Sequence, residues 1–421
     1  MSENESKGNV FAIATMFALF FMIAFVTNFA TPMGVIAKNQ FQASNALSQL
    51  GNAANFIAYL FMGIPGGLIL KRKGYKFTAL AAVAIGFAGV GVQLISGYIS
   101  SFPVYVLGAF IAGFSMCMLN LVTNPLLNTL GGGGKKGNQL VQFGCSLNSV
   151  GATLSPAVLG WLIGEITKDT AFIKAAPALM IAMGIFALAF VIVAFSKIPE
   201  PHMETAEEKS ARLSGQTSVM KDIAATLKFR HFTLGALAIF FYIVIEVGVP
   251  AMGFNYMTEV GKPWYVGAAV AGSVCGAYWF LMMCGRLLGG VVGGKVSSRV
   301  QVSFLATLGI CLLLAAMFAP MKMVTLFGYQ FPLSMTFMVA VGLCTSVMWG
   351  GIFNMAAEGL GKYVPIGSGI FMAMVFGGIL IPVQGLIADK VGILNSYWLS
   401  IGLLAYVLFY ALIGSRVKKS E

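Results

Sequence analysis

Residues 199–231 read PEPHMETAEEKSARLSGQTSVMKDIAATLKFRH, and this polar stretch separates the sixth from the seventh of about twelve hydrophobic runs. It mixes acidic with basic side chains and lacks the apolar runs found on either side of it, which is typical of a linker. Residues 218–229 within it predict a short amphipathic helix that lies on a membrane surface. We therefore divide the chain into residues 1–198, a linker at 199–232 and residues 233–421.

The two parts beside the linker are unusually apolar. Hydrophobic residues make up 58% of the 421 residues and charged residues only 10%, so few helices have a polar face for water. A helix needs roughly 20 apolar residues to cross a hydrocarbon core about 30 Å thick. Only helices satisfy their backbone within such runs, so we expect an all-α membrane protein with twelve transmembrane helices. The runs fall at 10–36, 47–70, 77–100, 103–130, 139–165, 175–196, 233–257, 267–293, 301–319, 330–358, 367–388 and 391–415.

The net charge of +12 is scattered over the loops between these runs, which argues against a nucleic-acid-binding face. With both termini placed in the cytoplasm, nineteen Lys and Arg residues fall on the cytoplasmic side and six on the opposite side. This fits the positive-inside rule and predicts a multi-pass protein with both termini cytoplasmic. All six cysteines fall within the runs, so the sequence supports neither a disulfide framework nor a metal site.

The two parts repeat each other. Gly66-Gly67 and Gly289-Gly290 both precede a basic turn, and the Gly-to-Pro spacing of 151–156 recurs at 377–382. Matches in this order describe a six-helix unit duplicated in parallel, hence two six-helix bundles. Such a duplication predicts a substrate site between the bundles near the middle of the membrane.

Glu246 is the one acidic residue near the middle of a run, since the other thirteen fall in termini, loops or run ends. A carboxylate at that depth is costly, so we expect it to be protonated, paired or facing a water-filled cavity. It is our candidate for ion coupling. The alternative is a structural carboxyl group that is hydrogen-bonded to a neighbouring helix.

Arg286 is the one basic residue inside a run, about two turns from its end, and Glu358 lies at the end of another run. We expect these two residues to pair and to form a gate. The alternative for Arg286 is a side chain that extends to the membrane interface. Both residues look too shallow to belong to the primary site.

Polar and aromatic side chains recur at the middle of the runs. Amides donate and accept hydrogen bonds and aromatic rings stack on C–H faces, so this combination suits a neutral sugar. Each amide has a structural alternative, because Asn and Gln also hold membrane helices together. The candidate substrate-binding residues are Asn28, Thr31, Asn120, Asn124, Gln142, Asn148, Tyr242, Asn255, Tyr256, Trp279, Trp349, Asn354 and Gln384.

Neither ATP coupling nor enzyme chemistry is indicated. The glycines at 131–134 lack the strand and the Ser or Thr of a phosphate-binding loop. The two histidines, His202 and His231, both lie in the linker. We therefore expect no enzyme activity and no cofactor other than a co-transported proton or sodium ion.

Four segments carry a family resemblance: Asn124-Pro125 with Leu130-Gly131; Leu147 to Gly151; Tyr242 to Val247 with Asn255-Tyr256; and Glu358 to Asp389. In these segments the chain resembles the fucose/glucose-galactose permease family, which includes fucose:proton symporters, of the major facilitator superfamily. The resemblance implies a bacterial inner-membrane permease that imports a monosaccharide by alternating access, driven by an ion gradient. It places Glu246 on the span-7 carboxylate of the family and Asn148 on its span-5 asparagine.

The chain departs from fucose permeases at two acidic positions. Thr31 stands where they carry Asp in span 1, and Asn120 stands where they carry Glu in span 4. Any coupling must therefore rest on Glu246 or be absent. Sodium remains an alternative to the proton, because a carboxylate with amide oxygens suits a hard cation.

The leading hypothesis is secondary active transport of a neutral monosaccharide, coupled through Glu246. The alternatives are a sugar uniporter, a transporter or exporter of a non-sugar compound, and a receptor or scaffold with a transporter fold. The expected partners are the sugar and the lipid bilayer, with no nucleic acid, and we expect a monomer.

Overall fold

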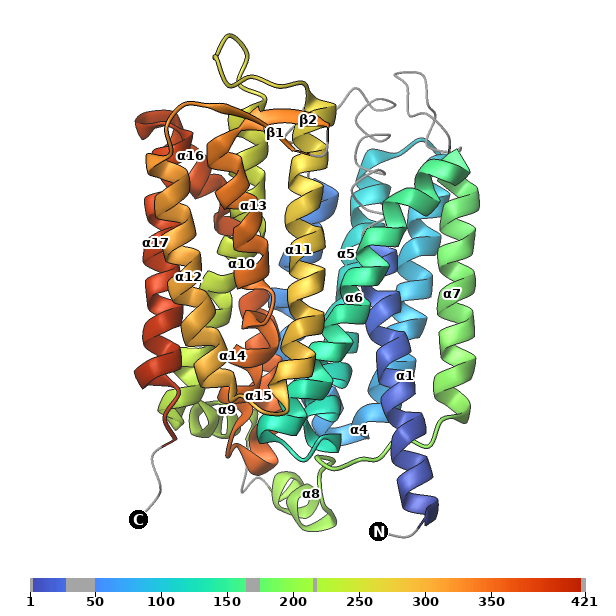
Figure 1. Ribbon diagram of the computed structural model, residues 1–421. Helices are drawn as coiled ribbons and strands as arrows, with labels where there is room; N and C mark the ends of the chain where they lie inside the picture. Colours follow the sequence, from blue (N-terminus) through green and yellow to red (C-terminus); the bar gives the residue numbers. More distant parts are fainter. Residues whose placement is uncertain (1–2, 28–49, 164–174, 215–217, 327, 418–421) are drawn as a thin grey trace. The chain divides into compact units, whose positions relative to one another are not determined.

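The computed structural model describes residues 3–27, 50–163, 175–214, 218–326 and 328–417 (Figure 1). Each hydrophobic run falls on helix in this part of the chain, and nine of the described helices are long and apolar enough to cross a membrane. This confirms the all-α membrane class. The helices of the first part are α1 (Glu3–Thr27), α4 (Leu50–Tyr98), α5 (Phe102–Leu130), α6 (Gly134–Ile163) and α7 (Ala176–Phe195).

The second part contains α10 (Arg230–Met257), α11 (Ala268–Gly293), α12 (Ser298–Phe318), α13 (Leu333–Thr345), α14 (Met348–Ala357), the 3-10 turn η2 (Gly361–Tyr363), α15 (Val364–Ala373), the 3-10 segment η3 (Met374–Leu380), α16 (Ile381–Val391), α17 (Ile393–Phe409) and the π-helical turn η4 (Tyr410–Gly414).

Helix α4 covers two of the predicted runs because it is two helices joined at Gly74. Gly74 has φ +83°, which L-residues with a side chain rarely adopt, so the chain turns there. Glu200 at the start of the linker accepts hydrogen bonds from the backbone N–H groups of Tyr75 and Lys76. A carboxylate in this position satisfies the orphan donors at the start of the second helix.

The described chain forms two compact units. Unit 1 contains residues 1–132, 147–229 and 359–376, and unit 2 contains residues 133–146, 230–358 and 377–421. Each unit thus includes a segment from the opposite sequence half. The predicted bundles at 1–198 and 233–421, which rest on sequence duplication, stay a prediction.

In unit 1, α4 packs along α5 and α7, and α15 packs on α4. The contact between α4 and α15 depends on glycine, because a Cβ at Gly63 would lie 2.6 Å from the carbonyl oxygen of Gly369. A side chain on either residue would push the two backbones apart. The large buried side chains of this unit include Phe20, Tyr75, Tyr105, Phe186 and Phe371.

In unit 2, α10 packs on α11, α13, α14 and α17, while α12 packs on α13 and α17. The first turns of α6 lie against the end of α11: the Lys135 ammonium group donates to the carbonyl of Lys295 at 2.8 Å, and Gly290 lies against the ring of Phe143. The large buried side chains of this unit include Tyr242, Tyr278, Tyr397 and Tyr410.

Two of the runs that the sequence predicts as single spans are interrupted. The run 330–358 breaks between α13 and α14 at Ser346 and Val347, and the run 367–388 contains η3, seven residues long. Breaks of this kind in membrane helices are tolerated where neighbouring groups satisfy the backbone, and long 3-10 segments often mark hinges.

A two-stranded antiparallel hairpin, which the sequence did not predict, precedes α13. Strand β1 (Met323–Leu326) pairs with β2 (Tyr329–Pro332), with Met323 opposite Pro332. The predicted run at 330 therefore begins too early, since α13 starts at Leu333. Pro332 has no N–H to donate and ends the strand.

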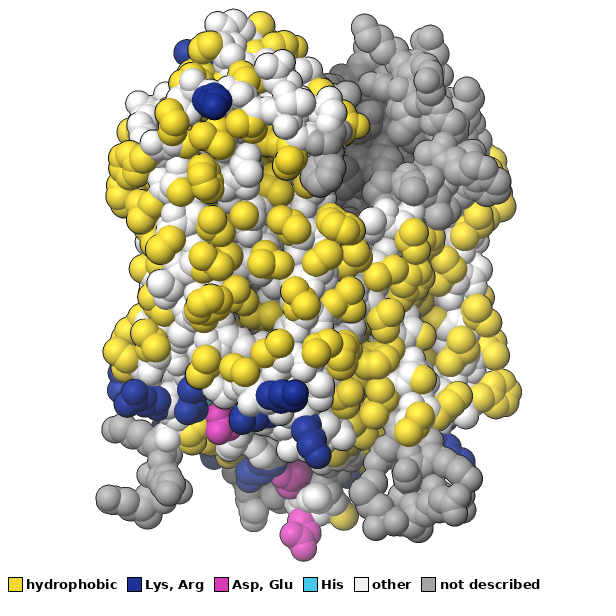
Figure 2. Space-filling model, in the orientation of Figure 1, with side chains coloured by type: hydrophobic (Ala, Val, Ile, Leu, Met, Phe, Trp, Pro, Cys, Tyr) yellow, Lys and Arg dark blue, Asp and Glu magenta, His cyan; other side chains and the backbone are white. Residues whose placement is uncertain are grey.

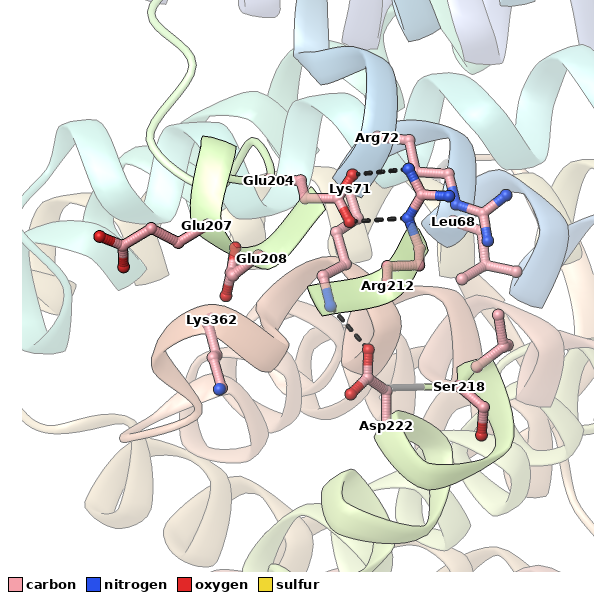
Figure 3. A pocket seen from close by; sticks show the side chains of 11 residues that line it. Leu68, Lys71, Arg72, Glu204, Glu207, Glu208, Arg212, Ser218, Asp222 and Lys362 are labelled. Carbon is pink, nitrogen blue, oxygen red and sulfur yellow. Dashed lines mark hydrogen bonds and ion pairs between the residues drawn. The ribbon is translucent and has the colours of Figure 1, made fainter. Parts of the chain in front are cut away.

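The linker contains the predicted amphipathic helix, α9 (Val219–Lys228), and an unpredicted one, α8 (Ala206–Leu213). Lys71 at the end of the first helix of α4 pairs with Asp222 of α9 at 2.6 Å. Glu204 binds Arg212 through two hydrogen bonds, which hold the pKa of this carboxyl group below its usual value (Figure 3). These side chains line a cavity of about 240 Å³. The Lys71–Asp222 pair joins the linker to α4, and the Glu204–Arg212 pair lies within the linker.

Candidate substrate and ion site

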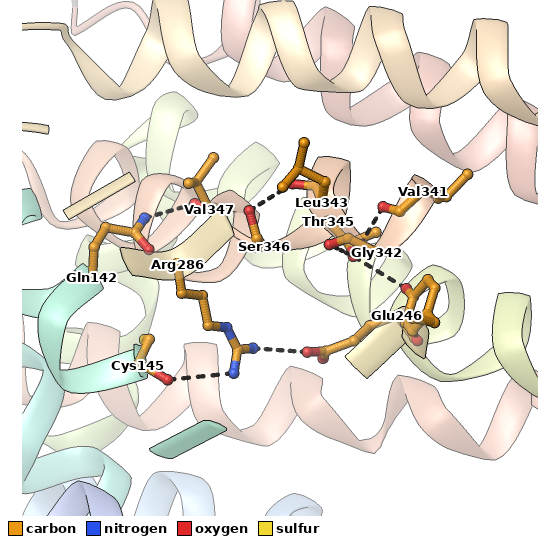
Figure 4. A network of polar contacts seen from close by, with 11 residues as sticks. Gln142, Cys145, Glu246, Arg286, Val341, Gly342, Leu343, Thr345, Ser346 and Val347 are labelled. Carbon is orange, nitrogen blue, oxygen red and sulfur yellow. Dashed lines mark hydrogen bonds and ion pairs between the residues drawn. The ribbon is translucent and has the colours of Figure 1, made fainter. Parts of the chain in front are cut away.

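Glu246 of α10 forms an ion pair with Arg286 of α11. Their nearest oxygen and nitrogen atoms are 3.0 Å apart, and only 13% of the Glu246 side chain and 10% of the Arg286 side chain are exposed. Figure 4 shows the guanidinium group between the Glu246 carboxylate and the backbone carbonyl of Cys145, 3.5 Å away. The paired form of Glu246, one of the three alternatives from the sequence, is therefore the one that the structure contains.

Arg286 lies about two turns from the end of its helix, as the sequence predicts, and its side chain reaches further into the unit than its Cα. Its Cα lies seven residues before the end of α11 at Gly293, which is roughly 10 Å along a helix. Helical side chains tilt toward the N-terminus of their helix, so the long Arg286 side chain extends away from that end and reaches Glu246.

The predicted ion pair between Arg286 and Glu358 is wrong, because each residue has another partner. The Glu358 carboxylate is 3.2 Å from Arg299 of α12, and its backbone carbonyl is 2.7 Å from the His231 ring. The Glu358 side chain is 56% exposed. A gating role for either residue stays a prediction, with the partners now changed.

The backbone at Glu246 is held by a neighbouring tyrosine. Pro250 lies four residues further along α10 and has no N–H, so the Glu246 carbonyl loses its helical hydrogen bond. The hydroxyl group of Tyr278 donates to this carbonyl at 3.1 Å and also lies 3.1 Å from the Thr345 hydroxyl group. This contact supplies a donor to the carbonyl that Pro250 leaves without one.

Two aromatic residues and one amide lie in the same unit as the pair. Tyr242 lies one helical turn before Glu246, and its ring centroid is 6.4 Å from that of Trp349. Gln142 donates from its amide nitrogen to the carbonyl of Val347, at the break between α13 and α14, at 2.9 Å. In the part of the chain that the structure describes, the Gln142 amide oxygen is buried and makes no hydrogen bond, and the buried Tyr242 hydroxyl faces the Glu246 carboxylate. Unsatisfied groups of this kind are uncommon in proteins and suit a polar ligand.

A cluster of amides occupies unit 1. Asn120 of α5 donates to the Tyr59 hydroxyl at 3.0 Å, and Asn124 donates to the Asn120 backbone at 3.0 Å. Asn148 of α6 donates to the carbonyl of Phe20 in α1 at 3.0 Å. Tyr59 is not among the residues predicted from the sequence, although it follows Asn52 and Asn55 at helical spacing. Asn28 and Thr31 lie outside the described residues.

The remaining candidates make structural contacts in the described chain. Tyr256 stacks on Trp264 with 4.9 Å between ring centroids, and Asn354 donates to the Ser298 hydroxyl at 2.9 Å. The buried Gln384 donates to Ser400 at 3.2 Å. Asn255 and Trp279 are exposed. Among the predicted residues, Tyr242 lies one turn from Glu246, Trp349 lies beside Tyr242, and Gln142 lies one turn from Cys145.

The comparisons with known proteins agree with this fold. Residues 13–382 match the family described as Major Facilitator Superfamily. The chain is 27% identical to a glucose/galactose transporter of Brucella abortus, over 99% of this chain and 97% of that protein. It is 22% identical to the L-fucose-proton symporter of Escherichia coli, over 92% and 89% of the two chains.

A crystal structure of the E. coli fucose:proton symporter FucP superposes with a TM-score of 0.83 at 18% identity, covering 97% of this chain and all of that chain. Likeness at this identity shows the fold, and the matched family covers most of the chain. The protein is therefore a multi-pass membrane transporter of the major facilitator superfamily, related to glucose/galactose transporters and to fucose:proton symporters.

Proposed function

We propose that this protein imports a neutral monosaccharide by alternating access and that uptake is coupled to a proton gradient through Glu246. The observation that carries the proposal is the buried ion pair between Glu246 and Arg286. Its charges cancel while it is intact. A change in the charge of either partner therefore alters the electrostatics of the whole site.

Protonation of Glu246 would break this balance. A neutral carboxyl group binds Arg286 far less strongly than a carboxylate does, so proton binding releases the guanidinium group for other partners. Sodium fits this site less well. It needs several oxygen ligands, and the guanidinium group 3.0 Å from the carboxylate repels a second cation.

The substrate class follows from the relatives and from the groups near the pair. The related proteins are named for glucose, galactose and fucose, all of them neutral sugars. A balanced ion pair leaves no net charge to attract an ionic substrate. The Tyr242 hydroxyl group and the unsatisfied amide oxygen of Gln142 suit sugar hydroxyl groups, and the Trp349 ring suits a sugar C–H face.

A sugar uniporter is the second candidate, and the same pair favours it. Arg286 gives Glu246 a permanent counter-charge, so the site is neutral without a proton. The sequence also carries Thr31 and Asn120 at the two positions where fucose permeases carry acids. A uniporter equilibrates its sugar across the membrane and does not accumulate it.

The test is uptake of labelled glucose, galactose and fucose into proteoliposomes, with proton and sodium gradients imposed separately. We expect native protein to accumulate one of these sugars when a proton gradient is present. Glu246→Gln should lose accumulation and keep sugar exchange between the two sides, because the carboxamide cannot take up or release a proton.

The matched control is Glu259→Gln, which removes a partly exposed carboxylate whose ion-pair partner in the described chain is Lys262, 3.7 Å away. This variant should accumulate sugar as the native protein does. Sugar accumulation by Glu246→Gln would contradict the coupling role of Glu246. Equilibration of sugar by native protein regardless of the gradient would establish the uniporter. Absence of movement of all three sugars would contradict the substrate class.

A further inference from the structure

A groove runs along α12, α17 and η4 on the surface of unit 2. Its volume is about 720 Å³, and apolar side chains, among them Phe304, Leu308, Leu408 and Leu412, line most of its length. Arg299 and Arg416 line it as well. Figure 2 shows basic side chains gathered at one end of the face over α12 and α17 and hydrophobic side chains over the rest.

The two guanidinium groups are only partly used by the protein. Arg299 is held in place by the Ser415 hydroxyl at 3.1 Å, the Ser415 carbonyl at 3.0 Å and Glu358 at 3.2 Å. Among the described residues its Nη1 has no acceptor. Arg416 donates from Nε to the carbonyl of Leu412 at 3.2 Å, and neither of its terminal nitrogens has an acceptor in this part of the chain.

The charges at this end favour an anion. Glu358 offsets part of the charge of Arg299, whereas Arg416 has no acidic partner among the described residues. Arg299 also lies in the first turn of α12, where the exposed N–H groups and the helix dipole add positive potential. The basic end therefore suits a phosphate group, and two Nη groups of Arg416 can bind it through two hydrogen bonds.

The apolar part of the site is divided by a ridge. A second groove, of about 250 Å³, lies between α11, α12 and α13 and shares Val300 and Phe304 with the first. Phe304 is 66% exposed and stands between the two grooves. A ligand with one phosphate and two apolar chains can place one chain on each side of this ridge.

We propose that this surface is a binding site for an anionic phospholipid. The phosphate lies against Arg299 and Arg416, and the two acyl chains follow the grooves beside Phe304. Basic pockets between membrane helices bind anionic headgroups in this way, and lipid chains need the apolar walls that a free phosphate does not. The site is separate from the ion pair of Glu246 and does not depend on the proposed transport activity.

The experiment is native mass spectrometry of the full chain released from mixed micelles that contain phosphatidylglycerol or phosphatidylcholine. We expect native protein to retain phosphatidylglycerol in preference. Arg416→Gln should reduce retention about fivefold, which corresponds to roughly 1 kcal/mol for one basic residue near a membrane surface. Thr307→Trp, which fills the groove from an exposed position on α12, should also reduce retention.

The matched control is Lys295→Gln. Lys295 is exposed in the same unit, just before α12, and does not line either groove. This variant should retain lipid as native protein does. Equal retention of the two lipids by native protein would overturn the proposal, as would equal losses in Arg416→Gln and Lys295→Gln. Full retention by Thr307→Trp would overturn the placement of the acyl chains.

Discussion

The buried charges of Glu246 and Arg286 are tolerated because the two side chains pair with each other. An ion taken out of water loses several kcal/mol of hydration, and only a close partner of opposite charge offsets this loss. The 3.0 Å distance and the low exposure of both side chains meet that condition. Substitution of one partner should therefore lower the free energy of unfolding more than substitution of both.

Arg286→Gln should lower the free energy of unfolding by about 3–5 kcal/mol, because it leaves Glu246 buried without a counter-charge. The double variant Glu246→Gln with Arg286→Gln should recover most of this loss, since two amides can bond to each other. Reversible unfolding in mixed detergent measures both values. Additive losses in the double variant would show that the two side chains do not stabilise each other.

The sequence located one half of this pair and not the other. Glu246 stands out because it is the one acid near the middle of a hydrophobic run. The sequence predicts a gate of Arg286 with Glu358, because the position of Arg286 along its run gives the depth of its Cα and leaves out the length of its side chain. Gln384, which the sequence predicts as a sugar ligand, donates its amide nitrogen to hydroxyl groups on α17, and its role as a ligand stays a prediction. A sequence shows that an amide is buried and does not show which partner it has.

At the scale of elements, the helices that carry the site are interrupted. Pro250 removes a backbone N–H from α10 just after Glu246, and Ser346 and Val347 separate α13 from α14. Each interruption frees backbone groups that another helix must satisfy, here through Tyr278 and Gln142. The break at Ser346 could not be predicted, because no Gly or Pro lies between residues 343 and 349. The interruption at Pro250 could be predicted, because the proline is visible in the sequence four residues after Glu246.

Tyr278→Phe and Tyr397→Phe form a matched pair that tests this point. Both hydroxyl groups are buried and donate to α10 carbonyls, at Glu246 and Val249 respectively. Tyr278→Phe should lose roughly 1–3 kcal/mol of stability, because Pro250 leaves the Glu246 carbonyl without another donor, whereas Tyr397→Phe should lose about 0.5–1.5 kcal/mol, the usual contribution of one hydrogen bond. Only Tyr278→Phe should also change the pH at which sugar uptake is half-maximal, measured in the proteoliposome assay. The same shift in Tyr397→Phe would show a general loosening of α10.

At the scale of the whole molecule, packing and sequence duplication divide the chain differently. Residues 133–146 come from the first sequence half and pack in unit 2, while residues 359–376 come from the second half and pack in unit 1. The duplicated runs predict the helices well, because an apolar run of that length has few other structures available in a membrane. They do not predict which segments pack together in one conformation, because that depends on the state of the transporter.

A disulfide between the two sequence halves should therefore stop transport. In unit 2, a Cβ at Gly293 of α11 would lie 3.4 Å from the Cα of Gln139 in α6, so the two positions are close enough for cysteine side chains to meet. With the six native cysteines replaced, oxidised Gln139→Cys with Gly293→Cys should lose sugar uptake, and a reducing agent should restore it. The single variants should be insensitive to oxidation. Uptake at the native rate by fully cross-linked protein would mean that these segments keep their contacts throughout the cycle, and alternating access would then have to proceed without separating α6 from α11.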